Sequence, residues 1–272
     1  MTLELIGTQL NGESNGDFFG FSTALSGDGQ VLAIGAPHNE GDETLDRILY
    51  YSGEWTSNQN TARNPIKKIV GADVGSVKVF KKVNGDWVQL GNEILGDHEG
   101  SRFGVSLSLS EDGSFLLVGS PIDDSLTRGQ VRLYQLVNNT WTQVGIDLEN
   151  EVAGSGGYND WHGYSTSLSS DGSVLALGAF WNSNTAAGTN DGHVRIYQNL
   201  NGNLTQIGSD IDASNTDDSC GFSISLSSDG TIVAVSSPDA GHVRIFKNIN
   251  NSWTQLGSNI TVPTTSQYGQ AI

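Results

Sequence analysis

The sequence predicts an all-β protein, a β-propeller of four-stranded antiparallel blades, and two observations carry this prediction. One phrase occurs four times, and a second and a third phrase follow it each time. Each set of phrases has the pattern of four short strands, and no window longer than a turn has helical spacing. Sheets of this kind, stacked face to face around an axis, bury one another's apolar faces and leave only short edges. A flat solenoid is the alternative arrangement.

The first phrase predicts the first two strands of each unit and the turn between them. An Asp-Gly pair begins nine residues after Phe19, Phe103, His162 and Cys220, at the positions Asp28, Asp112, Asp171 and Asp229. Asp-Gly favours a hairpin because glycine adopts the positive φ that the turn requires. The second strand, for example residues 115–118, is apolar without a break, which predicts that both of its faces are covered.

The second and third phrases predict the third and fourth strands. The third strand alternates Val, a basic residue, an aliphatic residue and an aromatic one, as in residues 131–134. An Asn-rich turn such as Asn138-Asn139 leads into the fourth strand, which carries a Trp or Leu at one repeated position: Trp87, Trp141, Leu204 and Trp253. This half-apolar pattern is typical of outer strands. We therefore expect the repeated Trp to pack in the core or between blades.

The chain divides into about four to five such units, in an incomplete ring or an open arc. The predicted units are 8–59, a degenerate unit 60–91, 92–145, 146–208 and 209–257, and residues 258–272 begin a further one. Two interpretations of the first 90 residues remain open. The connection 37–75 is either a long insertion between strands two and three, or it contains a damaged extra unit. We favour the extra unit, because residues 47–56 also match the pattern of strands three and four.

Composition excludes several classes of function. The 272 residues hold 30 Asp and Glu against 13 Lys and Arg, a formal net charge of −17, which repels nucleic acids and anionic lipids. One cysteine, Cys220, permits no internal disulfide and no thiolate zinc site. The apolar runs are too short to span a bilayer, and the first residues lack a signal-peptide pattern. We expect no nucleic-acid partner and no membrane span.

The repeated phrases resemble a known family. Phe19-Gly20 with Gly35-Ala36-Pro37 is similar to the FG-GAP repeat of integrin α-type propellers, and the likeness recurs with Phe103-Gly104 and with Cys220-Gly221. It is closest to the repeat arrays of secreted marine bacterial proteins, so the resemblance implies a secreted or cell-surface adhesion protein. The calcium loop of that family is not carried over. It has shrunk here to a Ser-x-Asp-Gly turn, whereas calcium takes six to eight oxygen ligands.

The long loops on one face hold most of the acidic residues, and the candidate binding residues lie on them. Aromatic and acidic residues near the 146–208 unit suit a sugar ring or a protein partner. The candidate ligand-binding residues are Tyr158, Asp160, Trp161, Trp181, Asp123 and Asp124. The densest oxygen cluster suggests weak calcium binding by Asp210, Asp212, Asp217 and Asp218. The simpler interpretation, which we favour, is that acidic loops keep the protein in solution.

Two classes of function follow. The leading hypothesis is a non-catalytic interaction or adhesion module that binds a protein or polysaccharide through its acidic loop face. The five histidines are scattered, and no nucleophile or metalloprotease motif occurs, so we predict no catalytic residue and no enzyme. The alternative is an extracellular propeller hydrolase or lyase that uses carboxylates of the loop face.

Overall fold

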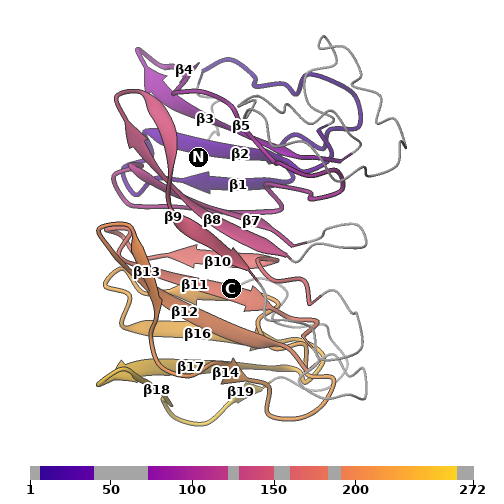
Figure 1. Ribbon diagram of the computed structural model, residues 1–272, viewed down its shortest axis with the longest axis vertical. Coiled ribbons are helices and arrows are strands. Elements are labelled where there is room, and N and C mark those ends of the chain that lie inside the picture. Colours follow the sequence, from indigo (N-terminus) through magenta and orange to yellow (C-terminus); the bar gives the residue numbers. More distant parts are fainter. Residues whose placement is uncertain (1–6, 40–72, 122–128, 150–159, 183–190, 262–272) are drawn as a thin grey trace, which may run out of the picture.

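The described part of the chain is all-β and forms a propeller-like series of four antiparallel sheets (Figure 1). The computed structural model describes residues 7–39, 73–121, 129–149, 160–182 and 191–261. Each sheet runs in chain order from its first strand to its fourth, and in three sheets a short extra strand pairs with the third strand. The predicted fold class is confirmed. Among the described residues no helix is long and apolar enough to cross a membrane.

The strands fall into four groups along the chain. The first sheet holds β1 (Ser22–Leu25), β2 (Val31–Ala36), β3 (Ser76–Val83), β4 (Asp86–Gln89) and β5 (Ile94–Leu95). The second holds β6 (Ser106–Leu109), β7 (Phe115–Ser120), β8 (Gln130–Val137) and β9 (Thr140–Glu149). The third holds β10 (Ser165–Leu168), β11 (Val174–Ala179), β12 (His193–Leu200), β13 (Asn203–Gln206) and β14 (Ile211–Asp212). The fourth holds β15 (Ile224–Leu226), β16 (Ile232–Ser237), β17 (His242–Ile249), β18 (Ser252–Gln255) and β19 (Ile260–Thr261).

The first sheet differs from the predicted division into units. Strands β2 and β3 pair directly, with Ala36 opposite Ser76 and Val31 opposite Lys81. The strands at 76–89, which we assigned to a separate degenerate unit at 60–91, therefore complete the sheet that β1 and β2 begin. This pairing corresponds to the disfavoured alternative, a long connection between strands two and three. Residues 47–56 and residues 76–89 both match the sequence pattern of strands three and four. The pattern alone therefore could not show which of the two stretches pairs with β2. Residues 47–56 lie outside the described part of the chain.

The hairpin between the first two strands is held by its own side chains. In the second sheet, Ser110 Oγ donates to Asp112 Oδ1 (2.7 Å), and the same oxygen accepts the Ser114 N–H (2.9 Å). Gly113 follows with a φ of 67°. The second strand then runs through the core, and β11 is buried along its whole length. The Ser-x-Asp-Gly signal in the sequence is thus a closed hydrogen-bonded turn.

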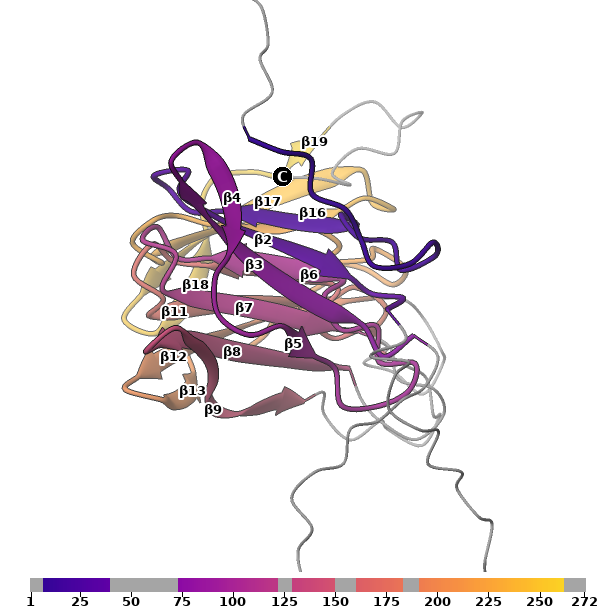
Figure 2. The same cartoon turned by 90° about the horizontal axis from the view of Figure 1, so that it is seen from above.

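The sheets meet through their first strands, where β6 contacts both β1 and β10, and β10 contacts β15. Among the described elements, no comparable contact joins β15 back to β1, so the series is open. The first and fourth sheets lie at opposite ends of the view in Figure 1, and Figure 2 looks along the series with the first sheet in front. The tight hairpins lie at one end of the strands. The connections from strand two to three and from strand four to the next sheet leave from the opposite end (Figure 1). We call this second end the loop face.

Candidate functional site

One repeated position on the loop face carries a buried polar residue. Asp17, Ser101, Asp160 and Asp218 are 4–7% exposed, and each precedes a residue with φ between 50° and 54°. The three carboxylates bind groups of their own loops. Asp17 accepts the Ser14 N–H (2.9 Å), Asp160 accepts the Asn182 amide (3.1 Å), and Asp218 accepts two backbone N–H groups. These acids therefore shape the loops that begin each sheet.

Three of the predicted ligand-binding residues come together in the third sheet. The ring centroids of Trp161 and Trp181 are 5.4 Å apart, and Trp181 remains 41% exposed. Asp160 precedes Trp161, and its Asn182 partner follows Trp181. The aromatic cluster extends from here to Tyr164, Phe180 and Phe222, with neighbouring centroids 4.6–5.7 Å apart. Tyr158, Asp123 and Asp124 lie outside the described residues.

Three of the four residues predicted to bind calcium are held by different partners, and the fourth, Asp212, lies in β14 opposite His193. Asp210 receives two bonds from Arg195 (2.9 and 2.6 Å), and Asp218 caps the backbone of residues 214 and 215. Burial alone would raise the pKa of Asp210, but the bonds from Arg195 outweigh it and hold that pKa below its usual value. Asp217 donates its backbone N–H to Asp191. In the described ranges no group of three or more His, Cys, Asp or Glu is placed to hold a metal ion.

A histidine–aspartate pair lies on the loop face of the first sheet. His38 follows the end of β2, and Asp73 precedes the start of β3, so the pairing of these two strands brings them together. His38 Nδ1 lies 2.8 Å from Asp73 Oδ1. The two side chains are 28% and 38% exposed, and no described residue bonds to Nε2 of His38. A carboxylate at Nδ1 fixes the ring and its tautomer, so that Nε2 can accept a proton from a bound molecule.

The surroundings restrain this pair. The Phe18 ring packs against His38 with centroids 4.7 Å apart, and the His38 N–H donates to the Asp17 carbonyl (3.3 Å). Asp73 adopts a φ of 59°, and its carbonyl accepts the Arg102 N–H (3.0 Å). The Arg102 guanidinium forms no ion pair with any residue that the structure describes. The His38 imidazole and the Arg102 backbone therefore both contact Asp73 at the same edge of the molecule.

A second such pair, His98 and Asp97, differs from the first in its exposure and in its partners. Its Nδ1–Oδ1 distance is 2.7 Å, but the two residues are neighbours in sequence and are 42% and 46% exposed. Asp97 also binds Arg132. The contacts of Asp97 with Arg132 and His98 hold its pKa low against the effect of its own burial. The His98 ring is thus more solvated, and its carboxylate is shared with an arginine.

Sequence reasoning missed the His38–Asp73 pair. The two residues are 35 positions apart, on either side of the long connection, and in the part of the chain that the structure describes such a pair between strands two and three occurs in the first sheet alone. Residues 66–80 align without gaps on residues 232–246, and this alignment places Asp73 opposite Asp239, just before a third strand. Combined with the pairing of β2 and β3, that alignment would have brought His38 and Asp73 to one end of the sheet.

Comparison with known proteins supports the fold. No family model and no curated protein matches the chain. The periplasmic gluconolactonase of Pseudomonas aeruginosa matches with a TM-score of 0.55 and 15% identity, over 90% of this chain and 58% of that one. A candidate 6-phosphogluconolactonase of Bacteroides uniformis matches with a TM-score of 0.56 and 11% identity, over 90% and 57%. This chain therefore spans less than two thirds of the length of either protein.

These findings correct the predicted function. We expected a non-catalytic adhesion module and no enzyme, whereas the solved propellers that share this fold are named as lactonases. The expectation of no enzyme rested on the absence of continuous catalytic motifs, and such motifs do not detect residues that strand pairing brings together, as it does His38 and Asp73. At 11–15% identity, the likeness establishes the fold alone. The FG-GAP resemblance remains a prediction, since no comparison names that family.

Proposed function

We propose that the loop face of the first sheet is a hydrolase site that opens the ester bond of a lactone or a related sugar-derived ester. The observation that carries this proposal is the His38–Asp73 pair, in which a carboxylate orients an imidazole whose Nε2 is unbonded within the described structure. The names of the two solved propellers suggest the substrate class. The reaction needs one base that also serves as an acid, and this pair supplies it.

His38 acts as the general base in the first step. Nε2 accepts a proton from water while the water oxygen bonds to the carbonyl carbon, and the carbonyl π electrons move onto the oxygen. When this tetrahedral intermediate collapses, the acyl C–O bond breaks. The imidazolium returns its proton to the leaving alkoxide. The product of a lactone is therefore a single hydroxy acid, and the histidine is regenerated.

Asp73 and Arg102 support this step electrostatically. Asp73 stabilises the imidazolium that forms on His38, as a carboxylate at Nδ1 does in other hydrolytic sites. Arg102, whose backbone N–H bonds to the Asp73 carbonyl, is the cation that we assign to the developing oxyanion. His98 and Asp97 are assigned no catalytic role, because Asp97 already neutralises Arg132.

Two expectations from the sequence enter as parts of this proposal. Trp161 and Trp181, beside Asp160, offer an aromatic surface on which a sugar ring or a protein segment could stack. Replacing Trp181 by Ala should then weaken carbohydrate binding. The FG-GAP resemblance supports a secreted or cell-surface location, which fractionation of cells that express the full-length gene product would test.

Steady-state hydrolysis of a δ-lactone, followed by acid release, tests the proposal. The wild-type protein should hydrolyse the lactone above the uncatalysed rate. His38→Asn should lower kcat/KM by about 100-fold or more, because it removes the general base. The matched control is His98→Asn, which removes the other histidine of a His–Asp contact and should leave kcat/KM within about 2-fold. A wild-type rate equal to the blank, or an equal loss in both variants, would overturn the proposal.

A further inference from the structure

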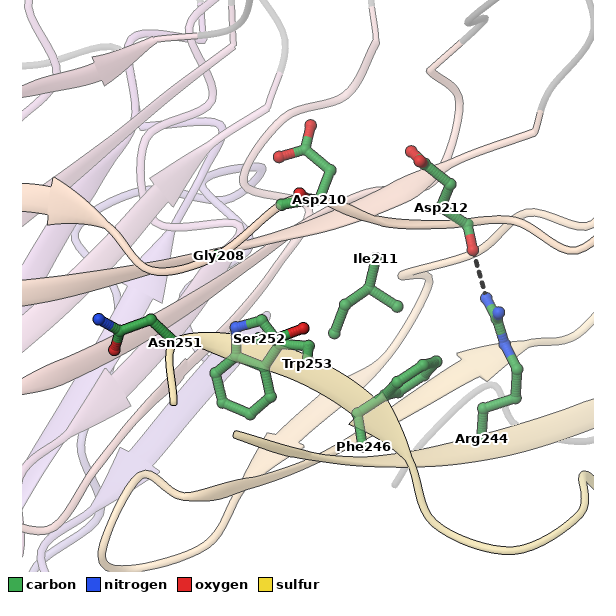
Figure 3. Close-up of a pocket in the computed structure, with 10 residues that line it drawn as sticks. Gly208, Asp210, Ile211, Asp212, Arg244, Phe246, Asn251, Ser252 and Trp253 are labelled. Carbon is green, nitrogen blue, oxygen red and sulfur yellow. Dashed lines mark hydrogen bonds between the residues drawn. The ribbon is translucent and has the colours of Figure 1, made fainter. Parts of the chain in front are cut away.

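A pocket of about 320 Å³ lies between the third and fourth sheets (Figure 3). The segment around β14 forms one wall, and residues of β17 and β18 form the other. The Trp253 indole is fixed in this wall, because its Nε1 donates to the Ile207 carbonyl (2.9 Å). Ile211 and Phe246 complete the apolar part of the lining, while Asn251, Ser252 and Arg244 bring polar groups. The pocket thus combines an apolar surface with a single arginine.

Arg244 is a buried arginine that has no charged partner within the described ranges. Arg244 is only 6% exposed to solvent. Nη2 donates to the Asp212 backbone carbonyl (2.7 Å) and contacts Cys220 Sγ (3.2 Å). Nε is fully buried and unbonded, and Nη1 has no partner among the described residues. Burial raises the pKa of the Cys220 thiol to about 11, so the sulfur is neutral near pH 7.

The equivalent arginines of the preceding sheets are neutralised by carboxylates. Arg195 binds Asp210 through two bonds, and Arg132 binds Asp147 (3.0 Å) and Asp97. Asp210 precedes Ile211, which lies opposite Val194, the residue before Arg195. In the fourth sheet, Ile260 lies opposite Val243 in the same way, so that Asn259 takes the position of Asp210. Gln255 binds Asn259 (2.9 Å) as Gln206 binds Asp210 (2.7 Å), which confirms the equivalence.

The second acidic position is also neutral in the fourth sheet. Ile94 in the first sheet and Ile211 in the third sheet occupy the same position, because each pairs with the second residue of its own sheet's third strand. Asp97 lies three residues after Ile94, and Ser214 lies three residues after Ile211. Ser214 therefore takes the position of the carboxylate that binds Arg132. Both acids that would neutralise Arg244 are replaced by neutral residues. In a chain of net charge −17, this is a specific loss of negative charge around one arginine.

The carboxylates that do line the pocket do not neutralise Arg244. Asp210 is paired with Arg195. The side chain of Asp212 points away from the guanidinium, which contacts the backbone carbonyl of that residue instead (Figure 3). The remaining neighbour is the Phe246 ring, 5.2 Å from the guanidinium carbon. A buried cation of this kind is costly unless an anion joins it.

We propose that this pocket binds a small organic carboxylate, with the guanidinium of Arg244 on the carboxylate group and Trp253, Phe246 and Ile211 against the carbon skeleton. The ligand's carboxylate takes the place that Asp210 occupies beside Arg195 in the third sheet. This binding site is separate from the hydrolytic site, which lies on the loop face of the first sheet. A hydroxy acid is one anion of this class.

Isothermal titration with D-gluconate tests the proposal, and D-glucitol is the neutral comparison with the same carbon number. Gluconate should bind with saturation, and glucitol should not. Arg244→Gln should weaken gluconate binding by at least about 10-fold, the usual effect of losing a charged hydrogen bond. Asn259→Asp should weaken it similarly, since the added carboxylate would pair with Arg244 as Asp210 pairs with Arg195. This second variant keeps the arginine and its packing.

The matched control is Asn250→Asp, which adds the same charge at an exposed turn position with a φ of 52°. It should leave binding unchanged, and so should His38→Asn. Equal losses in Asn259→Asp and Asn250→Asp would show a general charge effect and overturn the proposal. Loss in His38→Asn alone would assign gluconate to the first sheet and overturn it as well. Binding of inorganic phosphate in preference to gluconate would contradict the carboxylate assignment.

Discussion

Gly119 on β7 lies directly against Gly163, the residue that leads into the next sheet. A Cβ at position 119 would be 2.0 Å from the Gly163 carbonyl oxygen and 2.2 Å from Ser106 Oγ. Ser106 Oγ in turn donates to that carbonyl (2.7 Å). The same contact recurs between Gly35 and Gly104 and between Gly178 and Gly221. Backbone approach at these glycines therefore fixes the spacing between successive sheets.

Substitution of Gly119 by Ala should destabilise the protein severely. The new methyl group would overlap the Gly163 carbonyl, so we expect the free energy of unfolding to fall by about 3 kcal/mol or more. Gly85→Ala is the control, because Gly85 has a φ of 96° and open space around it. It should cost only about 1 kcal/mol from backbone strain. Urea denaturation measures both, and equal effects would contradict the close packing of sheets.

Trp141→Leu should reveal the role of the repeated Trp. Trp141 is 4% exposed, and its Nε1 donates to the Leu90 carbonyl of the preceding sheet (2.9 Å). Its loss should lower the free energy of unfolding by about 3 kcal/mol, from a cavity and an unbonded carbonyl. Trp87→Leu, at the same repeat position but only half-buried, should cost about 1 kcal/mol. If Trp87→Leu lowered the free energy of unfolding more than Trp141→Leu does, packing of the Trp between sheets could not be the cause of its stabilising effect.

Buried histidines should make the protein sensitive to mild acid. Burial lowers the pKa of His162 to about 3 and that of His193 to about 4. In the unfolded chain their pKa is about 6.5, so the unfolded state binds more protons as the pH falls below that value. Stability is therefore complete above pH 6.5 and declines below it, by about 2 kcal/mol per histidine at pH 5.

His162→Phe tests this pH dependence, because Phe103 occupies the same repeat position in the second sheet. Between pH 6.5 and pH 5, the free energy of unfolding of the variant should fall by about half as much as that of the wild-type protein. Urea midpoints measured at the two pH values give the comparison. An unchanged decline in the variant would contradict the assignment to buried neutral histidines.

Removing the charge of Asp210 should take away the carboxylate that accepts two hydrogen bonds from the buried Arg195. The Arg195 side chain is 4% exposed, and that of Asp210 is 23% exposed. We expect Asp210→Asn to lower the free energy of unfolding by about 2–3 kcal/mol, less than for a fully buried pair. Asp86→Asn, at an exposed position of β4, should change it by less than about 0.5 kcal/mol. Thermal unfolding of the two variants would show whether the ion pair or net charge matters.

Much of the fold follows from the repeated phrases. The Ser-x-Asp-Gly pattern predicts a hairpin because its Ser and Asp side chains close the turn, as Ser110 and Asp112 do. Unbroken apolar runs predict the buried second strands such as β11. The partner of β2 was not predictable in this way, since two stretches matched the third-strand pattern. The short strands β5, β14 and β19 have only two residues each and leave no periodic signal.

The candidate site was harder to predict than the fold, for a physical reason. A repeat comparison finds what the units share, whereas the His38–Asp73 contact occurs where one unit departs from the others. Predicted acids such as Asp218 lie on the expected loops, but they bind backbone N–H groups there. Trp161 and Trp181 were both predicted on the loops of one unit, and their rings are in contact in the structure. They lie close together because Trp161 precedes the first strand and Trp181 follows the second strand of the same sheet.

The most direct test of the hydrolytic site is rescue of His38→Ala by added imidazole. If His38 supplies the base, this variant should hydrolyse the lactone at the background rate, and free imidazole should restore turnover in proportion to its concentration. His98→Ala should be active without imidazole and should not respond to it beyond the effect on the blank. A His38→Ala variant that keeps wild-type turnover, or that imidazole fails to restore while the protein remains folded, would contradict the account.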